Sequence, residues 1–215
     1  MRCRHCNTFL KKDLIDLGIC SPSNAYVTKK ELSKPQETFP LKVKICKKCY
    51  LVQTLDYTKS KTLFNDDYAY LSSVSKTWQT HCKEFSKKIT KSLSLDVNSQ
   101  VIEIASNDGC LLENFKKSKI KSIGIEPTKI AAKISRKKGI HTIEDFFNTI
   151  LAKKILKKYG SADLICANNV FAHVPDINDF VKALKIILSK DGVVTIEFPH
   201  LLNLIKNTLF DTIYH

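Results

Sequence analysis

The sequence predicts an α/β protein with a doubly wound parallel sheet, preceded by a small cysteine-rich domain. After residue 99, five short apolar runs alternate with segments of helical periodicity. These runs are continuously apolar, as expected for parallel strands that helices cover on both faces. Within the first 50 residues, two Cys-x-x-Cys pairs predict a domain held together by a metal.

The apolar runs predict strands at 101–104, 122–125, 140–143, 163–167 and 193–198. Helical patterns lie between them at 110–117, 129–138, 147–158 and 177–189, and a last segment follows at 201–205. Gly139 and Gly160 stand where helix C-caps belong. Ahead of the sheet, an apolar stripe at helical spacing predicts one more helix, on Trp78, Cys82, Phe85, Ile89 and Leu93.

These elements divide the chain into a zinc-binding domain at 1–60, a connector and lid helix at 61–98, a sheet domain at 99–207 and the start of a further domain at 208–215. Short strands are expected at 14–17 and 41–45. The polar and aromatic loop at 68–73 would be a lid over the sheet edge, although an ordinary surface loop fits the same spacing.

The length of 215 residues and the hydrophobic content of 43% suit a globular protein with one full domain and a small accessory one. No apolar run is long enough to cross a bilayer, and the first residues lack the apolar segment of a signal peptide. We therefore expect a cytoplasmic protein without a membrane partner. In a reducing compartment, the eight cysteines are expected to be thiols or metal ligands rather than disulfides.

The net charge of +14 invites a nucleic-acid partner. However, only Arg2, Arg4 and Arg136 are arginines, and arginine makes most bidentate contacts to nucleic acid. The lysines occur mostly in short pairs at helical surface positions, which favours a solvated surface. We therefore do not expect nucleic acid as the partner, whereas a small substrate with a diphosphate group would also suit a basic surface.

The two cysteine pairs are Cys3 with Cys6 and Cys46 with Cys49. Four thiolates without an open position describe structural zinc. The alternatives are accidental pairs or a redox dithiol, but a redox dithiol would open a helix beside a thioredoxin-type sheet, and neither pair does. The other cysteines are expected to be ordinary core or loop residues, namely Cys20, Cys82, Cys110 and Cys166.

The strand at 101–104 runs into a short polar turn at 105–109, at the edge where open α/β sheets bind nucleotides. This turn lacks the glycine pattern of a dinucleotide site and the Gly-Lys-Ser/Thr of a phosphate loop. A carboxylate in the first strand, Glu103, and a Glu-Pro pair after the second, Glu126-Pro127, flank the turn. This set suits a ligand with an amino-acid tail, a ribose and no phosphate, which describes S-adenosylmethionine.

The ends of the next strands complete the predicted donor site. Glu126 would accept both ribose hydroxyls, Asp145 with Phe146 would hold adenine, and Asn168 with Asn169 would lie beside the sulfonium. Ala105 stands where methyl-donor turns usually carry glycine, so its methyl group should crowd the methionine tail or shift the turn. The expected donor-binding residues are Glu103, Ala105, Asn107, Asp108, Gly109, Glu126, Pro127, Asp145, Phe146, Asn168 and Asn169.

The chain resembles a known family in four segments, which are the cysteine pairs with Cys46-Lys-Lys-Cys49-Tyr-Leu-Val-Gln53, Tyr68-x-Tyr70-Leu-Ser72-Ser73, Glu103-Ile-Ala-Ser-Asn107-Asp108-Gly109, and Phe210-Asp-Thr-Ile-Tyr214-His215. Together they look like the sugar C-methyltransferases of deoxysugar biosynthesis, which contain zinc and use S-adenosylmethionine. The resemblance implies a Rossmann-like class I methyltransferase sheet, a structural zinc and a nucleotide-linked keto-sugar as substrate. In the family the last motif reads Tyr-His-Glu-His and precedes a large C-terminal domain. We therefore expect a truncated chain, for which a separate C-terminal half is a candidate partner.

The resemblance also implies a reaction and its residues. The enzyme would remove a proton from the carbon next to the sugar ketone, and the enolate would attack the methyl group. His173 matches a histidine near the reacting centre, Tyr68 a tyrosine of the lid, and Tyr214 with His215 the terminal motif. The second histidine of that motif, which is the family's base, and the glutamate before it are not in this sequence. Without the resemblance, a histidine packed under the sheet edge is the simpler interpretation of His173.

Two alternatives stay open at this point. A zinc-ribbon RNA methyltransferase is favoured by the basic charge and opposed by the scarcity of arginine and by the terminal motif. A non-catalytic remnant would hold zinc and the methyl donor without transferring a methyl group. The sequence does not name the sugar, the methylated carbon, the nucleotide carrier or the oligomeric state.

Overall fold

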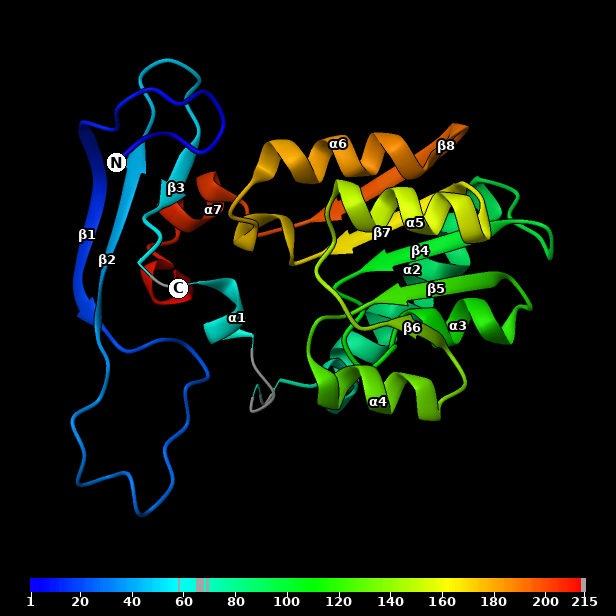
Figure 1. Cartoon of the computed structure of the whole chain (residues 1–215), viewed down its shortest axis with the longest axis horizontal. Helices are drawn as coiled ribbons and strands as arrows, with labels where there is room; N and C mark the ends of the chain where they lie inside the picture. The colour runs from blue at the N-terminus through cyan, green and yellow to red at the C-terminus, as the bar shows by residue number, and fades with distance from the viewer. Residues whose placement is uncertain (58, 65–67, 69, 214–215) are drawn as a thin grey trace. The chain divides into compact units, whose positions relative to one another are not determined.

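The computed structural model describes residues 1–57, 59–64, 68 and 70–213. The chain forms two compact units. The first, called the cysteine unit below, comprises residues 1–64, 175–178 and 199–215. The second, called the sheet unit, comprises residues 65–174 and 179–198. Figure 1 shows the elements of each unit.

The cysteine unit contains a three-stranded antiparallel sheet in the order β1-β2-β3. Its strands are β1 (Lys12–Cys20), β2 (Phe39–Ile45) and β3 (Val52–Thr54). The strands expected at 14–17 and 41–45 lie within β1 and β2. We did not expect β3, because three residues are too few to show a period of two. The unit also contains α1 (Ser60–Leu63), α7 (Leu201–Lys206) and the short 3-10 helix η3 (Phe210–Thr212).

The sheet unit is built on five parallel strands in the order β6-β5-β4-β7-β8. These are β4 (Gln100–Ile104), β5 (Lys121–Ile125), β6 (His141–Ile143), β7 (Ala162–Asn168) and β8 (Leu188–Glu197). The strand of this sheet that comes first in the sequence, β4, lies at the centre, between β5 and β7. Because the strand order reverses beside β4, its carboxyl end is a topological switch point, where such sheets bind ligands. The predicted doubly wound parallel sheet is therefore confirmed.

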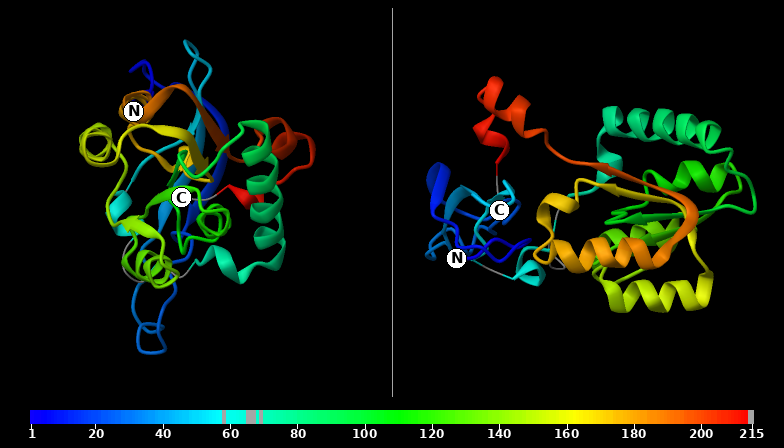
Figure 2. Two further views of the ribbon diagram at one scale, coloured as in Figure 1. Left: turned by 90° about the vertical axis from the view of Figure 1, so that its right-hand side faces the viewer. Right: turned by 90° about the horizontal axis from the view of Figure 1, so that it is seen from above.

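Helices cover both faces of this sheet (Figure 2). On one face, α5 (Thr149–Tyr159) and α6 (Ile177–Ile187) pack against side chains such as Ile102 and Ile165. On the other, α2 (Lys76–Ser92) and α3 (Leu112–Lys117) pack against neighbouring positions such as Val101 and Leu164. Strands that bury both faces must be apolar at every position, which explains the continuous apolar runs in the sequence. The remaining helix, α4 (Lys129–Lys137), connects β5 to β6.

Several boundaries differ from the prediction by a few residues, and local structure explains two of the differences. Helix α5 begins at Thr149 rather than at residue 147, because Asn148 is extended and its side chain accepts a hydrogen bond from the Leu151 amide. Strand β8 begins at Leu188, which pairs with Ala162 before the register shifts and Val193 pairs with Leu164. The predicted helix therefore ends at Ile187 instead of at residue 189.

Among the described helices, none combines the length and the apolarity that crossing a bilayer requires.

Candidate functional site

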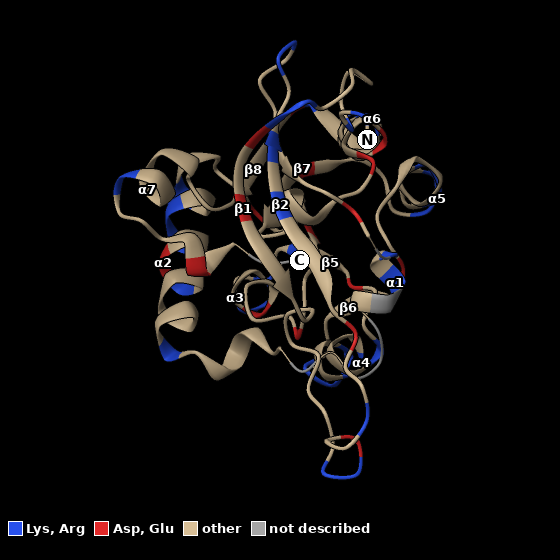
Figure 3. Ribbon diagram, turned by 90° about the vertical axis from the view of Figure 1, so that its left-hand side faces the viewer, with Lys and Arg blue, Asp and Glu red and all other residues tan. Residues whose placement is uncertain are grey.

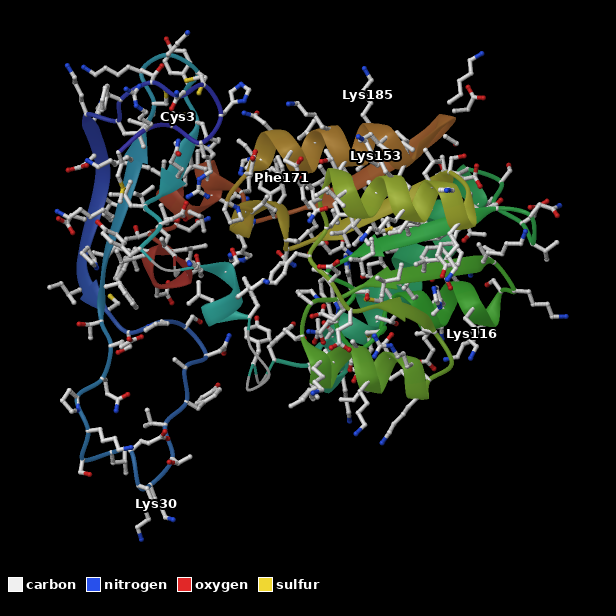
Figure 4. All side chains as sticks on the ribbon, in the orientation of Figure 1. Cys3, Lys30, Lys116, Lys153, Phe171 and Lys185 are labelled. Carbon is white, nitrogen blue, oxygen red and sulfur yellow. The ribbon has the colours of Figure 1, made fainter. Side chains whose placement is uncertain are left out.

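Four cysteines of the cysteine unit lie together, as the sequence predicted. The sulfur atoms of Cys3, Cys6, Cys46 and Cys49 all lie within 4.8 Å of one another. Cys3 Sγ is 3.6 Å from Cys49 Sγ, and Cys6 Sγ is 3.5 Å from Cys46 Sγ. Zinc–sulfur bonds of about 2.3 Å in a tetrahedron separate the sulfur atoms by roughly 3.8 Å. The four thiols therefore have the spacing of a closed structural zinc site, and Figure 4 shows Cys3 at this cluster.

The two halves of the cluster have the same backbone geometry. In each, the residue after the second cysteine has a positive φ, 60° at Asn7 and 61° at Tyr50. In each, the amide of that residue donates to the carbonyl of the first cysteine, at 2.9 Å. This tight turn aims both thiols of a pair to one side, and two such turns face each other across the cluster.

Gln53 supports the cluster and was not predicted as a site residue. Its side chain is buried, its Nε2 donates to Cys3 Sγ at 3.3 Å, and its Oε1 accepts from the Arg4 amide at 3.1 Å. Hydrogen bonding with Thr8 lowers the pKa of Cys6 to about 6. Both effects favour thiolates, which are the form that binds zinc.

In the sheet unit, the polar turn after β4 forms at the carboxyl edge. Three of its five residues have positive φ, which are Ala105 at 55°, Asn107 at 48° and Gly109 at 77°. The Ser106 amide donates to the Ile125 carbonyl at 3.1 Å, and the Gly109 amide donates to the Ser106 carbonyl at 2.9 Å. The turn thus folds back against the end of β5. Ala105 is accommodated by a left-handed backbone, the conformation that glycine adopts without strain.

Glu126, the first residue after β5, holds this turn in place. Its Oε2 accepts from the Asn107 amide at 2.8 Å. Its Oε1 accepts from the Thr128 amide at 2.8 Å and from the Thr128 hydroxyl at 2.5 Å. A carboxylate has about four acceptor sites, so capacity for one further donor remains. Burial raises the pKa of Glu126, although the bonds from Thr128 and Asn107 oppose this shift.

Asp108 is fully buried and connects three parts of the sheet unit. Its Oδ2 accepts from the amide and the hydroxyl of Ser73 and lies 3.4 Å from Lys138 Nζ. Beside it, Asn107 Oδ1 accepts from the Ser72 amide at 2.9 Å. Segment 70–73 is therefore fastened to the turn rather than being an ordinary surface loop. The motif that contains Ser72 and Ser73 indicated in the sequence that these residues belong to the site. No sequence feature indicated that Lys138 contacts Asp108.

Three buried oxygen atoms around the turn have no hydrogen-bond partner among the described residues. They are Glu103 Oε2, Ser106 Oγ and Asp108 Oδ1. Burial, together with the nearby Cys110, Glu126 and Asp108, raises the pKa of Glu103 well above its usual range. A buried acceptor without a partner is costly, so this edge of the sheet is arranged to receive hydrogen-bond donors or positive charge from a ligand.

The other predicted donor-binding residues lie at the ends of neighbouring strands. Pro127 follows Glu126 and is half-buried, and Asp145 and Phe146 follow β6. The Asp145 carboxylate accepts from the Phe146 amide at 2.8 Å. Asn168 ends β7, and Asn169 follows with a φ of 51°. All of these strand ends lie on the carboxyl edge, because the five strands are parallel.

Of the four predicted catalytic residues, the structure describes two, His173 and Tyr68. His173 ends the 3-10 helix η2 (Phe171–His173) after β7, is half-buried, and has its pKa lowered by burial. The imidazole is therefore neutral at neutral pH. Tyr68 is also half-buried. Tyr214 and His215 lie outside the described residues.

Comparisons with known proteins agree with this architecture. A family model described as "Putative zinc binding domain" matches residues 3–64, and one described as "Methyltransferase domain" matches residues 75–214. The chain belongs to the methyltransferase family. A solved structure, a SAM dependent methyltransferase from Archaeoglobus fulgidus, shares the fold with a TM-score of 0.51 and 17% identity, over 64% of this chain and 62% of that chain. The predicted Rossmann-like methyltransferase sheet with an N-terminal zinc-binding domain is thus confirmed.

One curated relative matches this chain over almost its whole length. The C-methyltransferase NovU of Streptomyces niveus is 27% identical over 99% of this chain. The chain spans about half the length of that relative, 50%. The predicted cofactors are confirmed at the level of the two domains, S-adenosylmethionine by the methyltransferase fold and zinc by the cysteine cluster in a zinc-binding domain.

Proposed function

We propose that this methyltransferase transfers the methyl group of S-adenosylmethionine to a carbon atom of a nucleotide-linked keto-deoxysugar. The observation that carries the proposal is the set of unpartnered buried oxygen atoms of Glu103, Ser106 and Asp108 around the turn after β4. A ligand with an ammonium group and no phosphate suits such a set of acceptors. The similarity to a C-methyltransferase over 99% of the chain supports carbon as the methyl acceptor.

S-adenosylmethionine supplies an electrophilic methyl group on a positively charged sulfur. We propose that Glu103 and Asp108 balance the positive charges of this donor, and that Glu126 and Pro127 form the ribose side. Asp145 and Phe146 would bind adenine. The turn formed by residues 105–109 would lie against the methionine tail. In this arrangement Asn168 and Asn169 face the reacting centre from the end of β7.

The transfer to carbon requires an acidic carbon–hydrogen bond in the substrate. A base removes the proton next to the ketone, and the electron pair becomes an enolate. The enolate carbon then forms a bond to the methyl carbon while the carbon–sulfur bond breaks, and the donor leaves as a neutral thioether. By resemblance, His173 and Tyr68 belong to this substrate side, together with Tyr214 and His215. Its neutral imidazole suits His173 for accepting a proton.

The first test is donor binding by the zinc-loaded chain. We expect calorimetry to detect binding of S-adenosylmethionine and of S-adenosylhomocysteine. Glu126→Gln should weaken binding about tenfold, because the carboxylate that holds the Asn107 amide and could accept one ribose hydroxyl is lost. Glu144→Gln, which removes an exposed carboxylate paired with Arg136, is the control and should bind as the wild type does. Absence of binding by the wild type would contradict the proposal.

The second test concerns the acceptor. The chain should be incubated with radiolabelled donor and a panel of nucleoside-diphosphate-linked keto-deoxysugars, and product formation followed. Methyl transfer to carbon, with exchange of the neighbouring proton in D₂O, is the expected result. Donor binding without transfer to any member of the panel would favour a non-catalytic binding protein.

The basic charge of the chain is the observation behind the RNA alternative. Lysine and arginine residues are distributed over several helices, including α2, α4 and α5 (Figure 3). Lys153 on α5 and Lys185 on α6 point away from the sheet (Figure 4). This distribution suits a solvated surface better than a single nucleic-acid face. If RNA, but not the nucleotide sugars, protected the bound donor from dissociation, RNA would replace the sugar as the proposed substrate.

A further inference from the structure

Glu197, the last residue of β8, joins two elements of the sheet unit. Its Oε2 lies 3.0 Å from His81 Nε2 on α2. Its Oε1 accepts from Asn169 Nδ2 at 3.1 Å, and its carbonyl accepts from the Asn169 amide at 2.7 Å. The carboxylate therefore connects α2, which covers one face of the sheet, with the turn that follows β7. We call His81, Glu197 and Asn169 the clasp.

The clasp is the second anchor of a segment that is already fastened to the turn at residues 105–109. At residues 70–73, the Tyr70 carbonyl accepts from Asn107 Nδ2 at 3.0 Å, and the Ser72 amide donates to Asn107 Oδ1. Helix α2 continues from this point, with Ser75 as its N-cap. The segment at 70–81 thus runs from the end of β4 to the end of β8, and it is tied down at both ends.

The clasp also fixes the backbone at the end of β7. Asn169 has a φ of 51°, in the left-handed region that asparagine adopts more readily than most residues with a side chain. Two of its polar groups are bound by one residue, Glu197. The neighbouring Asn168 ends the strand on the same edge, so its orientation depends on this turn. Sequence reasoning assigned Asn168 and Asn169 to the donor site but did not find Glu197 or His81.

We propose that His81 and Glu197 are positioning residues for methyl transfer, which hold the turn at Asn168 and Asn169 and the segment at 70–81 against the bound donor. The inference rests on the proposed binding of S-adenosylmethionine at this edge. His81 acts through Glu197, so neither residue is required to touch the donor. Tertiary contacts alone bring the pair together, because 116 residues separate His81 from Glu197 in the sequence.

A surface ion pair is the simpler role for these two side chains, and it makes a different prediction. The His81 and Glu197 side chains are 47% and 40% exposed, so the pair contributes little to stability. A surface ion pair would therefore leave both stability and donor affinity nearly unchanged when it is removed. A positioning role predicts that donor affinity falls while stability is nearly kept.

The experiment measures donor affinity by calorimetry and the thermal midpoint in His81→Phe, His81→Gln and Glu197→Ala. His81→Phe keeps an aromatic ring between Trp78 and Phe85 but removes the hydrogen-bond donor. We expect it to weaken binding of S-adenosylmethionine about tenfold, with a change in Tm of less than about 2 °C. His81→Gln retains an N–H donor and should recover most of the affinity. Glu197→Ala should lose at least as much affinity as His81→Phe.

The control is Glu113→Gln, which breaks the exposed ion pair with Lys117 on α3 and should leave affinity unchanged. The inference is wrong if the wild type binds the donor and His81→Phe binds it equally well. It is also wrong if His81→Phe and His81→Gln lose affinity to the same extent. Failure of the wild type to bind at all would instead contradict the proposed function, so the two failures can be told apart.

Discussion

At the scale of single residues, Ala105 is the clearest departure from a standard methyl-donor turn. The sequence led us to expect that its methyl group would crowd the ligand or shift the turn. The structure shows a formed turn in which Ala105 has a φ of 55°. A left-handed backbone costs an L-residue with a side chain roughly 1 kcal/mol compared with glycine. The backbone conformation at Ala105 therefore lowers the stability of the sheet unit by about this amount.

Ala105→Gly is expected to raise the free energy of unfolding by about 0.5 kcal/mol, since relief of strain slightly exceeds the added entropy of the unfolded chain. Denaturant unfolding followed by circular dichroism measures this change. Ala131→Gly, within helix α4, is the comparison and should lower stability by about 1 kcal/mol or more. A destabilised Ala105→Gly variant would show that the methyl group contributes packing that outweighs the strain.

Glu103 is a second residue whose destabilising effect on the folded protein can be measured. Its pKa is raised by burial, so the folded state favours the protonated form. Glu103 therefore makes its full contribution to the free energy of unfolding below its pKa in the unfolded chain, about 4.3. This contribution is lost as the pH rises towards the pKa of Glu103 in the folded state. Glu103→Gln removes this dependence. Thermal unfolding without ligand should show the variant to be more stable at neutral pH, by roughly 1–2 kcal/mol.

The advantage of Glu103→Gln should disappear near pH 4, where both side chains are neutral. With saturating S-adenosylmethionine the order at neutral pH should reverse, because the wild-type carboxylate then has a positively charged partner. A difference in stability that stays constant between pH 4 and pH 8 would contradict the assigned protonation behaviour.

At the scale of elements, Gly109 lets the turn at residues 105–109 pack against α4 and against Ile140, the residue before β6. Gly109 has a φ of 77°, and a Cβ atom there would overlap Ile140 Cδ1 and lie 2.7 Å from Ser135 Oγ. Gly109→Ala should therefore lower stability by about 2–4 kcal/mol, since strain and overlap add. Chemical denaturation measures the loss. We also expect donor affinity to fall, because the turn cannot keep its position.

Gly139→Ala separates the two causes of that loss. Gly139 has a similar φ of 72°, but the nearest side-chain atom to an added Cβ is the end of Lys116, which can move away. Its substitution should cost only the strain of the backbone, about 1 kcal/mol. Equal losses at positions 109 and 139 would mean that packing against Ser135 and Ile140 is not what requires Gly109.

At the scale of the whole molecule, the two units are stabilised in different ways. The sheet unit has two extended apolar clusters, one on each face of its sheet. The buried cluster of the cysteine unit is small and consists of Cys3, Leu10 and Cys46, with Cys6, Cys49, Leu51 and Leu55 packed against it. Most of this small core is the metal site itself, so its folding should depend on zinc.

Removal of zinc with a strong chelator is expected to abolish amide-exchange protection in β1, β2 and β3. Protection in β4, β5 and β7 should remain, because those strands are buried between helices. Hydrogen exchange read by mass spectrometry distinguishes the two regions. Cys46→Ser should lower the zinc content and reproduce the effect, whereas Cys20→Ser, at a cysteine outside the cluster, should change neither. Unchanged zinc content in Cys46→Ser would refute the four-cysteine site.

The sequence by itself determined the order of strands and helices in the sheet unit, the parallel sheet, the two cysteine pairs and the polar turn that follows the first strand of that sheet. Each of these is carried by short-range pattern, because apolar periodicity, glycine positions and cysteine spacing report on neighbouring residues. The strand β3 was not predicted, because three residues are too few to show the alternation of a strand.

Only the tertiary structure decided which distant side chains complete the site. Ser73 reaches Asp108 from 35 positions earlier, and His81 reaches Glu197 across 116 positions. Lys138 lies at the end of α4, yet its amine is 3.4 Å from the Asp108 carboxylate. Such pairs carry no periodic signal, since their approach depends on the order of strands in the sheet and on the face that each helix covers. The local sequence therefore encodes the helices and strands of this chain. The partners of its buried carboxylates are decided only when the sheet and its helices assemble.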